Sequence, residues 1–274
     1  MDCYFSCNSR VNLWNNSKAK KVDLLMFKKK IQKLRKSFLR RFLFLIKREK
    51  LLFKLNDIEL NLDIRDSIDR EIFFSGYYEE KQIQYLIENI KKHNIKRFID
   101  VGANIGIYAL SIANSIPDVI IDAFEPHKRA FERMEKNVMQ NNFSNIIKCH
   151  NFALSNENKE GYLLATARFG EYQSGGAKLS SEGKMKIKQV CGDKILKDEN
   201  KTIAIKVDVE GLELLVLQGI VNLIKNNRIF LQIEIFDQEF SKTSSFLDKH
   251  NFRLIDKGTF THQDTVKDYF YINF

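Results

Sequence analysis

The sequence lacks the features that mark several classes of protein. It has only 4 cysteines in 274 residues, too few for the dense disulfide framework of a small secreted domain. Cys3 and Cys7 have the spacing of zinc ligands, but no second Cys or His pair follows them nearby in the sequence. No apolar run approaches the roughly 20 residues that a membrane-spanning helix needs. These absences predict a reduced, cytoplasmic protein without a zinc site or a transmembrane segment.

Apolar side chains are numerous enough for one sizeable core. The chain is 44% hydrophobic and contains 22 Phe and 9 Tyr. A chain of this length buries most of the surface that its unfolded form exposes. Disordered sequences are poor in aromatic residues, so the bulk of this chain is predicted to fold.

The positive charge of the chain is confined to one segment. Residues 1–56 contain 16 Lys and Arg against 3 Asp and Glu, whereas residues 57–274 contain 29 against 32. A nucleic-acid groove across the main part of the chain would require the opposite distribution, so nucleic acid is not the expected partner. We therefore divide the chain into a basic N-terminal extension, residues 1–56, and a main domain, residues 57–274.

The basic extension contains a predicted amphipathic helix. Phe27, Ile31, Leu34 and Phe38 recur at steps of three and four residues, and Lys and Arg occupy the other faces. Residues 22–54 could hold the protein on the anionic inner face of a membrane, where each lysine contributes about 1 kcal/mol. Packing on the main domain or on a second copy of the chain, a homo-oligomer, explains the pattern equally well. Nucleic-acid phosphates rank behind both.

From residue 79 onward, strands alternate with helices. This alternation is typical of an α/β fold with a mostly parallel sheet and helices on both faces. Residues 252–255 and 268–274 then predict an antiparallel hairpin at one edge of the sheet, and residues 58–64 alternate as a β-hairpin does. The predicted strands of the alternating region are 97–99, 119–124, 146–152, 204–209 and 229–236, and the predicted helices are 79–92, 105–115, 129–140 and 212–225.

A glycine-containing turn, residues 100–106, follows the first strand of this region. Gly102 allows the backbone to turn tightly and approach a ligand, and Gly106 allows the following helix to pack near the strand. Asn104 is the residue type that best tolerates a left-handed conformation after Gly. Ligands of such sheets bind beyond the carboxyl ends of the strands, where the helix directs its free N–H groups. The spacing G-x-x-x-G lacks the middle glycine of a dinucleotide fingerprint, and no Gly-Lys-Ser/Thr of a P-loop follows.

An acidic residue, Glu125, ends the second strand. It lies 23 residues after Gly102, about the spacing at which a carboxylate reaches the hydroxyls of a ribose. Alternatively, Glu125 could simply place a favourable negative charge at the start of the helix 129–140. The glycine turn at the matching distance favours the ribose role. His127, directly after Pro126, is predicted to be exposed on a loop.

Two further carboxylates, Asp208 and Glu210, end a later strand and precede Gly211. In a continuing strand they would share one face of the sheet. Burying them without cationic partners is costly, which indicates a site. Capping of the helix 212–225 is the structural alternative for Glu210.

Together these motifs resemble those of FkbM-type methyltransferases in order and spacing. The resemblance covers about residues 57–240 and implies a Rossmann-like class I methyltransferase sheet. The motifs are Asp100–Gly106, Phe124-Glu-Pro126, Ala153-Leu-Ser155 and Lys206-Val-Asp-Val-Glu-Gly-Leu-Glu213 with Gly219, preceded by Asp69-Arg70 and Gly76-Tyr-Tyr-Glu79.

The resemblance implies an enzyme that uses S-adenosyl-L-methionine to methylate a hydroxyl of a sugar, a glycan or a secondary metabolite. Asp208 is our first choice for the base that accepts the hydroxyl proton. His150 and Glu234 are held in reserve, although a histidine inside an apolar strand is more often structural. Since no third ligand accompanies Asp208 and Glu210, no metal is predicted. The implied roles are cofactor-loop residues Gly102, Asn104 and Gly106, ammonium ligand Asp100, ribose ligand Glu125, adenine neighbour Ala153, cofactor wall Tyr78 and Glu79, and methionine-end and acceptor residues Asp208 and Glu210.

The choice of acceptor is predicted to lie in residues 166–188. Residues 161–164 and 185–190 form a predicted strand pair that carries a loop over the site, and Phe169 and Tyr172 in this loop could stack on a sugar. A solvent-exposed hairpin fits the same residues equally well.

Two other functions fit the sequence less well than a hydroxyl-methylating enzyme does. A nucleic-acid methyltransferase is disfavoured because the main domain is slightly acidic and lacks the Asn/Asp-Pro-Pro-Tyr/Phe motif of amino-methylating enzymes. A membrane-surface scaffold protein with a non-catalytic methyltransferase fold would have degenerate cofactor motifs, and the motifs here are intact.

Overall fold

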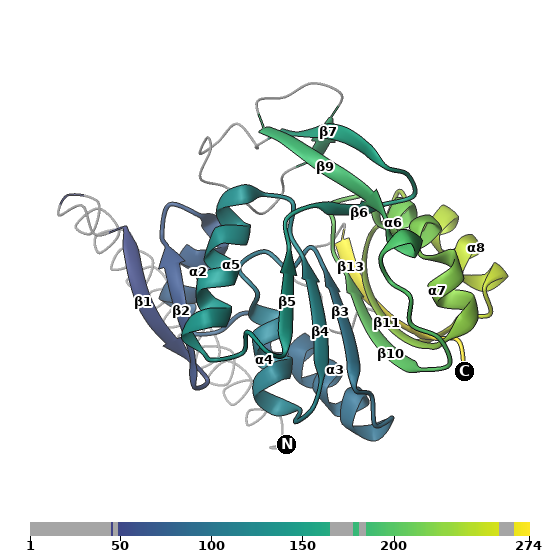
Figure 1. Ribbon diagram of the computed structural model, residues 1–274, viewed down its shortest axis with the longest axis horizontal. Coiled ribbons are helices and arrows are strands. Elements are labelled where there is room, and N and C mark those ends of the chain that lie inside the picture. Colours follow the sequence, from purple (N-terminus) through teal and green to yellow (C-terminus); the bar gives the residue numbers. More distant parts are fainter. Residues whose placement is uncertain (1–44, 46–48, 165–177, 181–184, 258–265) are drawn as a thin grey trace, which may run out of the picture. The chain divides into compact units, whose positions relative to one another are not determined.

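The computed structural model describes residues 45, 49–164, 178–180, 185–257 and 266–274 (Figure 1). The chain divides into two compact units, residues 1–49 and residues 50–274. Apart from Leu45, the predicted amphipathic helix lies outside the described residues. Residues 50–54, which the charge pattern places in the membrane-contacting segment, are strand β1 of the second unit. No helix among the described residues is long and apolar enough to cross a membrane.

The second unit is built on a seven-stranded sheet with the order β12-β13-β11-β10-β3-β4-β5. The five strands from β11 to β5 are parallel, and β13 is antiparallel to both of its neighbours. This confirms the predicted Rossmann-like, mostly parallel sheet with an antiparallel edge hairpin, and it adds that β13 inserts between β11 and β12. The strands are β3 (Arg97–Val101), β4 (Ile120–Phe124), β5 (Ile147–His150), β10 (Thr202–Val207), β11 (Arg228–Phe236), β12 (Arg253–Lys257) and β13 (Val266–Ile272).

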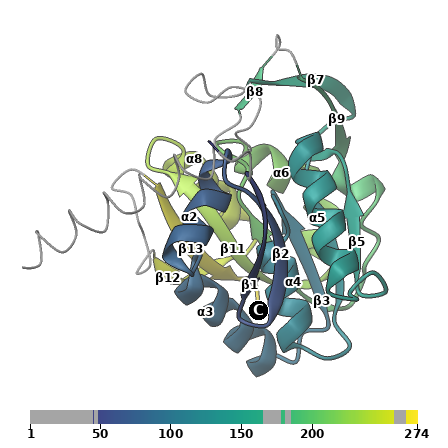
Figure 2. The same ribbon diagram turned by 90° about the vertical axis from the view of Figure 1, so that its left-hand side faces the viewer.

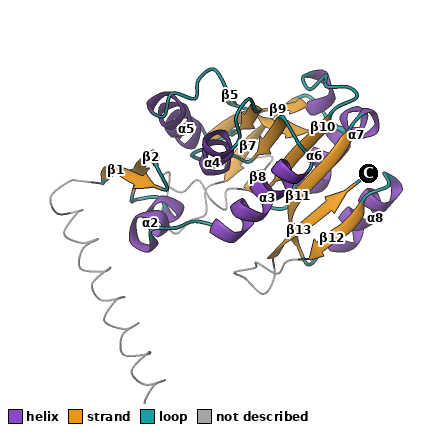
Figure 3. Ribbon diagram, turned by 90° about the horizontal axis from the view of Figure 1, so that it is seen from below, coloured by secondary structure: helices purple, strands orange, loops and turns teal. Residues whose placement is uncertain are grey.

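Helices cover both faces of this sheet (Figure 3). Successive side chains of a strand point to opposite faces, and in β3 every residue is buried. Phe98 therefore packs in the core with α3, α4 and α5, whereas Ile99 packs in the core with α6, α7 and α8. The helices are α3 (Glu80–Lys92), α4 (Ile107–Ser115), α5 (Lys128–Gln140), α6 (Glu213–Gly219), α7 (Val221–Asn226) and α8 (Phe240–Lys249).

The helix predicted over residues 212–225 is in fact two helices, because the chain leaves helical geometry at Ile220. Gly219, the last residue of α6, lies against the backbone of Ser155: a β-carbon at this glycine would stand 1.9 Å from the Ser155 carbonyl oxygen. No local sequence pattern predicts this close packing of α6 on a strand that is distant in the sequence.

A hairpin precedes the central sheet. Strands β1 (Lys50–Leu55) and β2 (Ile58–Asp63) pair across a turn at Asn56 and Asp57, both with positive φ. The predicted alternation is confirmed, since Ile58, Leu60 and Leu62 are buried. β2 contacts α5 and also α2 (Ser67–Ser75), the next helix (Figure 2).

A second sheet, with the order β6-β9-β7-β8, leaves the central one after β5. The strand predicted over residues 146–152 ends at His150, and the chain resumes as β6, which pairs with β9 instead of β4. The predicted pairing of residues 161–164 with 185–190 is confirmed by β7 and β9. The loop that carries Phe169 and Tyr172 lies outside the described residues. The strands are β6 (Ala153–Ser155), β7 (Lys159–Leu164), β8 (Lys178–Ser180) and β9 (Met185–Cys191), and a short 3-10 helix (Gly192–Lys194) follows β9.

Candidate active site

The site lies where the order of the central sheet reverses. The chain runs from β3 outward to β4 and β5 and then returns to place β10 on the other side of β3. In open α/β sheets the crevice at this switch point is the usual ligand site. A cavity of about 500 Å³ lies there, lined by the carboxyl ends of the parallel strands β3, β4, β10 and β11, by the amino end of the antiparallel β13, and by residues of α2, α3 and β6.

The loop after β3 forms the floor of this cavity. Gly102 has φ +85°, and a β-carbon at this position would stand 1.8 Å from the carbonyl oxygen of Asp208. The glycine is therefore required by the approach of two backbone segments. Asn104 has the predicted left-handed conformation, with φ 52°. Gly106, with φ +88°, starts α4 near Met134 of α5 and is absent from the cavity lining.

Asp100 lines the cavity at the end of β3. Its Oδ2 accepts a hydrogen bond from the Ala109 N–H at 3.2 Å. A carboxylate of the protein therefore already binds a free N–H group of the first turn of α4. Its Oδ1 has no hydrogen-bond partner among the described residues, although the side chain is fully buried. Burial raises the pKa of Asp100 to about 6, against the opposing field of Lys206. A ligand that brings a donor or a positive charge would satisfy this oxygen.

Glu125, at the end of β4, is held by two backbone amides. Its Oε2 accepts from the Asn104 N–H at 2.9 Å, and its Oε1 accepts from the His127 N–H at 2.7 Å. The side chain is buried and lines the cavity. Burial raises its pKa to about 7. Each oxygen keeps a further lone pair, so this carboxylate can accept hydrogen bonds from two neighbouring hydroxyls of a ligand.

The prediction that His127 is exposed is wrong. This residue is 2% exposed, and its Nδ1 accepts from the Ala130 N–H, which caps α5. Burial lowers the pKa of His127, so the ring is neutral near pH 7. A capping interaction after a proline is as good a reading of this position as a solvent-exposed loop, and the sequence carries no signal that separates them.

Tyr78 and Glu79, at the start of α3, also line the cavity. Glu79 has φ 41°, a left-handed conformation that is uncommon for a residue with a side chain. Its Oε2 accepts from the Tyr108 hydroxyl at 2.7 Å, and burial raises its pKa to about 7. The unusual backbone turns a carboxylate from the helix cap into the cavity.

Lys206 belongs to the motif that contains Asp208 and Glu210, but the sequence did not predict a role for it. Strand register places Asp100, Lys206 and Gln232 in one row across β3, β10 and β11. The Lys206 Nζ lies 2.9 Å from the Asp208 carboxylate and 4.6 Å from the centre of the Tyr108 ring, and the side chain is 4% exposed. It stands two residues before Asp208, so the requirement for a cationic partner could have identified it.

Asp208 and Glu210 both line the cavity, but they do not share a strand face. β10 ends at Val207, and Glu210 and Gly211 have φ of 58° and 99°. The N-cap of α6, Leu212, has no side-chain cap hydrogen bond, so capping does not explain Glu210. The Glu213 Oε1 instead accepts from the N–H groups of Val209 and Gly211, in the turn before the helix, at 3.2 and 3.0 Å.

Two acidic residues beyond β10 complete the wall. Glu234 of β11 pairs in register with Asp268 of β13, and both line the cavity. Asp268 was missed because the sequence places it in an edge hairpin, away from the site. His150, the other reserve base, is absent from the cavity lining: its Nε2 bonds to Asp122 and its ring stacks on Phe124.

The second sheet contributes apolar side chains to the cavity: Ala153 and Leu154 of β6 and Leu163 of β7 line it. Ser67 and Ile68 of α2 also line the cavity. Within the described ranges, no group of three or more His, Cys, Asp or Glu side chains could hold a metal ion.

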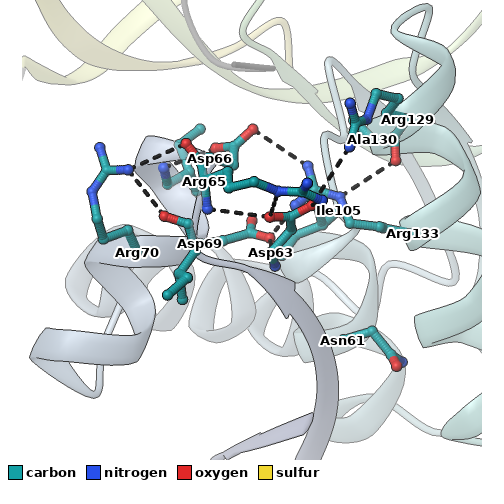
Figure 4. Close-up of polar contacts among 12 residues, drawn as sticks. Asn61, Asp63, Arg65, Asp66, Asp69, Arg70, Ile105, Arg129, Ala130 and Arg133 are labelled. Carbon is teal, nitrogen blue, oxygen red and sulfur yellow. Dashed lines mark hydrogen bonds and ion pairs between the residues drawn. The ribbon is translucent and has the colours of Figure 1, made fainter. Parts of the chain in front are cut away.

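Helix α2 is fixed by charged contacts to α5 (Figure 4). Arg133 of α5 bonds to the fully buried Asp69 and lies 3.3 Å from Asp66, the residue that caps α2. The Asp63 carboxylate at the end of β2 forms ion pairs with the guanidinium groups of Arg65, at 2.5 Å, and Arg129, at 3.6 Å. Asp69 belongs to a motif noted from the sequence, and this cluster explains it: the motif attaches one wall of the site to the helix that follows Glu125.

The fold and the site define a class of protein. A Rossmann-like sheet with an antiparallel strand inserted before its last strand carries a cavity at the switch point. The cavity holds a buried carboxylate, Glu125, with lone pairs left for two neighbouring hydroxyls, while the start of α4 is occupied by Asp100 rather than left open for a phosphate. This is the arrangement of an S-adenosylmethionine-dependent methyltransferase.

Comparison with known proteins identifies the family. The Methyltransferase FkbM domain matches residues 100–254, more than half of the chain. The chain therefore belongs to the FkbM methyltransferase family. It is 30% identical over 159 residues to the hexuronic acid methyltransferase AglP of Haloferax volcanii, a match that covers 57% of this chain and 62% of that protein, less than two thirds of its length.

Solved structures also match this chain, among them a methyltransferase FkbM and a protein in complex with AdoMet. The methyltransferase FkbM from Methylobacillus flagellatus KT matches with a TM-score of 0.44 and 18% identity, over 65% of this chain and 44% of that one. TYW2 of M. jannaschii, in complex with AdoMet, matches with a TM-score of 0.46 and 8% identity, over 82% and 84%.

Proposed function

We propose that this chain binds S-adenosyl-L-methionine in the switch-point cavity and methylates a hydroxyl group of a sugar, a glycan or a secondary metabolite. The observation that carries the proposal is the buried Glu125 carboxylate, fixed by two backbone amides where a ribose would lie. The similarity to AglP, which is named a hexuronic acid methyltransferase, supports a sugar acceptor.

The residues present fit this cofactor. Glu125 would accept the two ribose hydroxyls, and Asp100, through its unsatisfied Oδ1, would accept the methionine ammonium. Ala153 and Leu154 would face the adenine. Tyr78 and Glu79 would close the methionine end. Because Asp100 occupies the start of α4, the pyrophosphate of a dinucleotide would meet a carboxylate there, which disfavours NAD.

The chemistry supplied by the bound cofactor is a methyl group on a positively charged sulfur, which is already an activated leaving group. The protein has to hold the acceptor oxygen in line with that methyl group, and such positioning can contribute about 7–11 kcal/mol. The carboxylates of Asp100 and Asp208 balance positive charge at this end of the cavity. The positive charge of Lys206 lies 2.9 Å from the Asp208 carboxylate and opposes the rise that burial causes in the pKa of Asp100.

A base must accept the proton of the hydroxyl. Asp208 remains our first choice, since it lines the cavity beside Gly102 and is fixed by Lys206. Glu234 is a poor base near neutral pH, because burial and the neighbouring Asp208 raise its pKa to about 10 and keep it protonated. Glu210 lines the same wall and would position the acceptor.

Calorimetric titration tests the proposal. The full chain is titrated with S-adenosylmethionine, with its demethylated product S-adenosylhomocysteine, and with NAD. We expect micromolar binding of the first two, no binding of NAD, and a loss of at least a hundredfold in affinity for Glu125→Ala. Glu132→Gln, a change at an exposed position of α5, is the matched control and should bind as the wild type does. Equal binding by Glu125→Ala would remove Glu125 from the site.

A further inference from the structure

The cavity has two ends, and the proposed cofactor accounts for one of them. Glu125 and Ala153 lie at β4 and β6, on one side of β3. The sheet continues on the other side through β10 to β11 and β13. Glu234 and Asp268 therefore line the end of the cavity opposite Glu125 and Ala153, where an acceptor would meet the methyl group of the bound cofactor.

This acceptor end is lined by carboxyl groups and has no free cation among its described residues. Among the described residues that line the whole cavity, eight carry carboxylates and one, Lys206, carries a cationic side chain. The charge of Lys206 is already engaged by Asp208 at 2.9 Å and by the Tyr108 ring at 4.6 Å. No described side chain in the lining is thus left to neutralise a negative charge on an acceptor.

The acidic side chains at this end are positioned by a polar network. The Gln232 Nε2 donates to the Tyr108 hydroxyl and to the Asp268 Oδ1, both at 3.1 Å, and Tyr108 in turn donates to Glu79. Gln232 is fully buried, and its Oε1 has no hydrogen-bond partner among the described residues. Hydroxyl groups, which donate as well as accept, complement such a wall; a carboxylate or phosphate, which only accepts, does not.

Resting on the O-methylation proposed above, we propose that Glu234 and Asp268 select an acceptor that is uncharged or cationic around the methylated hydroxyl, and exclude uronates and phosphorylated sugars. This is the opposite of the acidic sugar in the name of AglP. The class of substrate is therefore a neutral hexose or an amino sugar.

The titration of the wall supports this inference. Burial and the neighbouring carboxylate of Asp208 raise the pKa of Glu234 to about 10, and burial raises the pKa of Asp268. The surroundings of Glu234 and Asp268 thus disfavour the ionised form of both carboxyl groups. An acceptor carboxylate brought to the same place would meet the same desolvation and the same repulsion. The protonated Glu234 can donate a hydrogen bond to a sugar oxygen.

Matched pairs of oligosaccharides test the selection. Each pair consists of a uronate-containing oligosaccharide and the same molecule after its carboxylates have been reduced to CH₂OH, so the two differ only where a neutral primary hydroxyl replaces a carboxylate. Mapping the methylated position excludes transfer to the new hydroxyl. Methyl transfer from labelled S-adenosylmethionine is measured with the full chain, after binding of S-adenosylhomocysteine has been confirmed by calorimetry. We expect the reduced member to be methylated at least tenfold faster than the uronate in every pair that reacts.

Each other outcome overturns a defined part of the argument. Equal or faster methylation of the uronate overturns the charge selection. Binding of S-adenosylhomocysteine without methylation of either member of any pair overturns the sugar acceptor, and this inference with it. Failure to bind S-adenosylhomocysteine overturns the proposed function itself, before the acceptor is considered.

Variants assign the selection to residues. In Glu234→Gln/Asp268→Asn, both carboxyl groups become amides of the same shape, and the preference for the reduced member should fall at least tenfold. Titration with S-adenosylhomocysteine reports whether the variant has a folded cofactor site. Glu132→Gln, remote from the cavity, should keep the wild-type preference. A preference unchanged in the folded double variant would remove both residues from the role.

Discussion

At the scale of single residues, backbone conformation and burial decide which side chains form the site. Gly102 and Asn104 have positive φ because the loop has to turn at once after β3 and remain under Asp208 and Glu125. Glu79 has the same unusual φ with a side chain present, and such outliers cluster at functional sites. Their cost is offset by the contacts of the neighbouring elements.

Gly102→Ala is expected to lower the free energy of unfolding by about 2 kcal/mol or more and to abolish cofactor binding. The new methyl group adds overlap with the Asp208 carbonyl to the cost of a positive φ. Gly76→Ala is the matched control: its φ is +77°, but nothing lies within 4 Å of the added carbon. It should cost only about 1 kcal/mol. Equal losses in urea unfolding of the two variants would contradict the close approach.

Glu125→Gln is expected to change how stability depends on pH. The folded pKa of Glu125, about 7, is above the value of 4.5 for a free side chain. The stability that this group contributes is therefore fully present below pH 4.5 and is lost as the pH rises through 7. Glutamine does not titrate, so the stability of the variant relative to wild type should rise by about 1 to 3 kcal/mol between pH 5 and pH 8.

Urea unfolding at the two pH values measures this change. The stability of Glu132→Gln relative to wild type should stay the same at both, because that side chain is exposed on α5. If the Glu125→Gln difference is also constant with pH, Glu125 titrates as an ordinary carboxyl group. The variant should in either case lose the cofactor, so stability and binding move in opposite directions at pH 8.

At the scale of elements, the walls of the cavity depend on contacts between distant parts of the chain. Helix α2 supplies one wall and is attached to α5 through Arg133, Asp66 and Asp69. Strands β6 and β7 supply another wall, because the chain leaves the central sheet after β5. Each of these elements is recognisable locally, but its partner is not.

Arg133→Met is expected to destabilise the protein by about 3–5 kcal/mol, because it leaves Asp69 buried without a cation. Burial raises the pKa of Asp69 to about 7 even beside Arg133. In the variant Asp69 therefore binds a proton more readily, and the loss should be larger at pH 8 than at pH 6. Urea unfolding at both pH values is the measurement.

A second change separates charge from packing in this cluster. Asp69→Asn, introduced into Arg133→Met, removes the unpaired charge and should recover most of the stability at pH 8. Arg129→Met, at a pair 3.6 Å long with an arginine side chain that is 35% exposed, should cost less than about 1 kcal/mol. An Arg133→Met variant as stable as Arg129→Met would show that the cluster does not hold α2.

At the scale of the whole molecule, charge separates the two units. The basic extension carries the positive excess, whereas the methyltransferase domain is slightly acidic. We propose that the extension brings the domain to an anionic membrane surface. Packing on a second copy of the chain is the competing proposal.

Sedimentation with phosphatidylserine-containing vesicles tests the membrane proposal. Binding of the full chain should weaken as salt is raised from 50 to 500 mM, because ions screen the attraction. Changing four lysines of the extension to glutamine should weaken binding at least tenfold, since each contributes about 1 kcal/mol. The control changes four exposed lysines of the domain. The extension lysines are Lys28, Lys29, Lys30 and Lys33, and the domain lysines are Lys128, Lys136, Lys148 and Lys225.

Equal binding by the two variants would reject the membrane proposal. Light scattering on the same samples then measures the mass of the particle. A dimer that dissociates only in the extension variant would assign the basic extension to contact between copies of the chain.

The sequence by itself determined the alternation of strands and helices, the left-handed Asn104 and the acidic Glu125 at the end of β4. These properties are local, because they follow from hydrophobic periodicity, from the conformational range of single residues and from spacing along one βαβ unit. The same local logic failed where a side chain had two equally good local uses, as at His127, which caps α5 from a buried position.

Only the tertiary structure decided which residues meet in the cavity. Lys206 faces Asp100 and Gln232, and Glu234 faces Asp268, because strand register joins segments that are far apart in the sequence. Register depends on the packing of whole sheets and helices, so no spacing along the chain encodes it. The pairing of carboxyl groups at the acceptor end is a property of that packing, whereas the cofactor loop is a property of one turn.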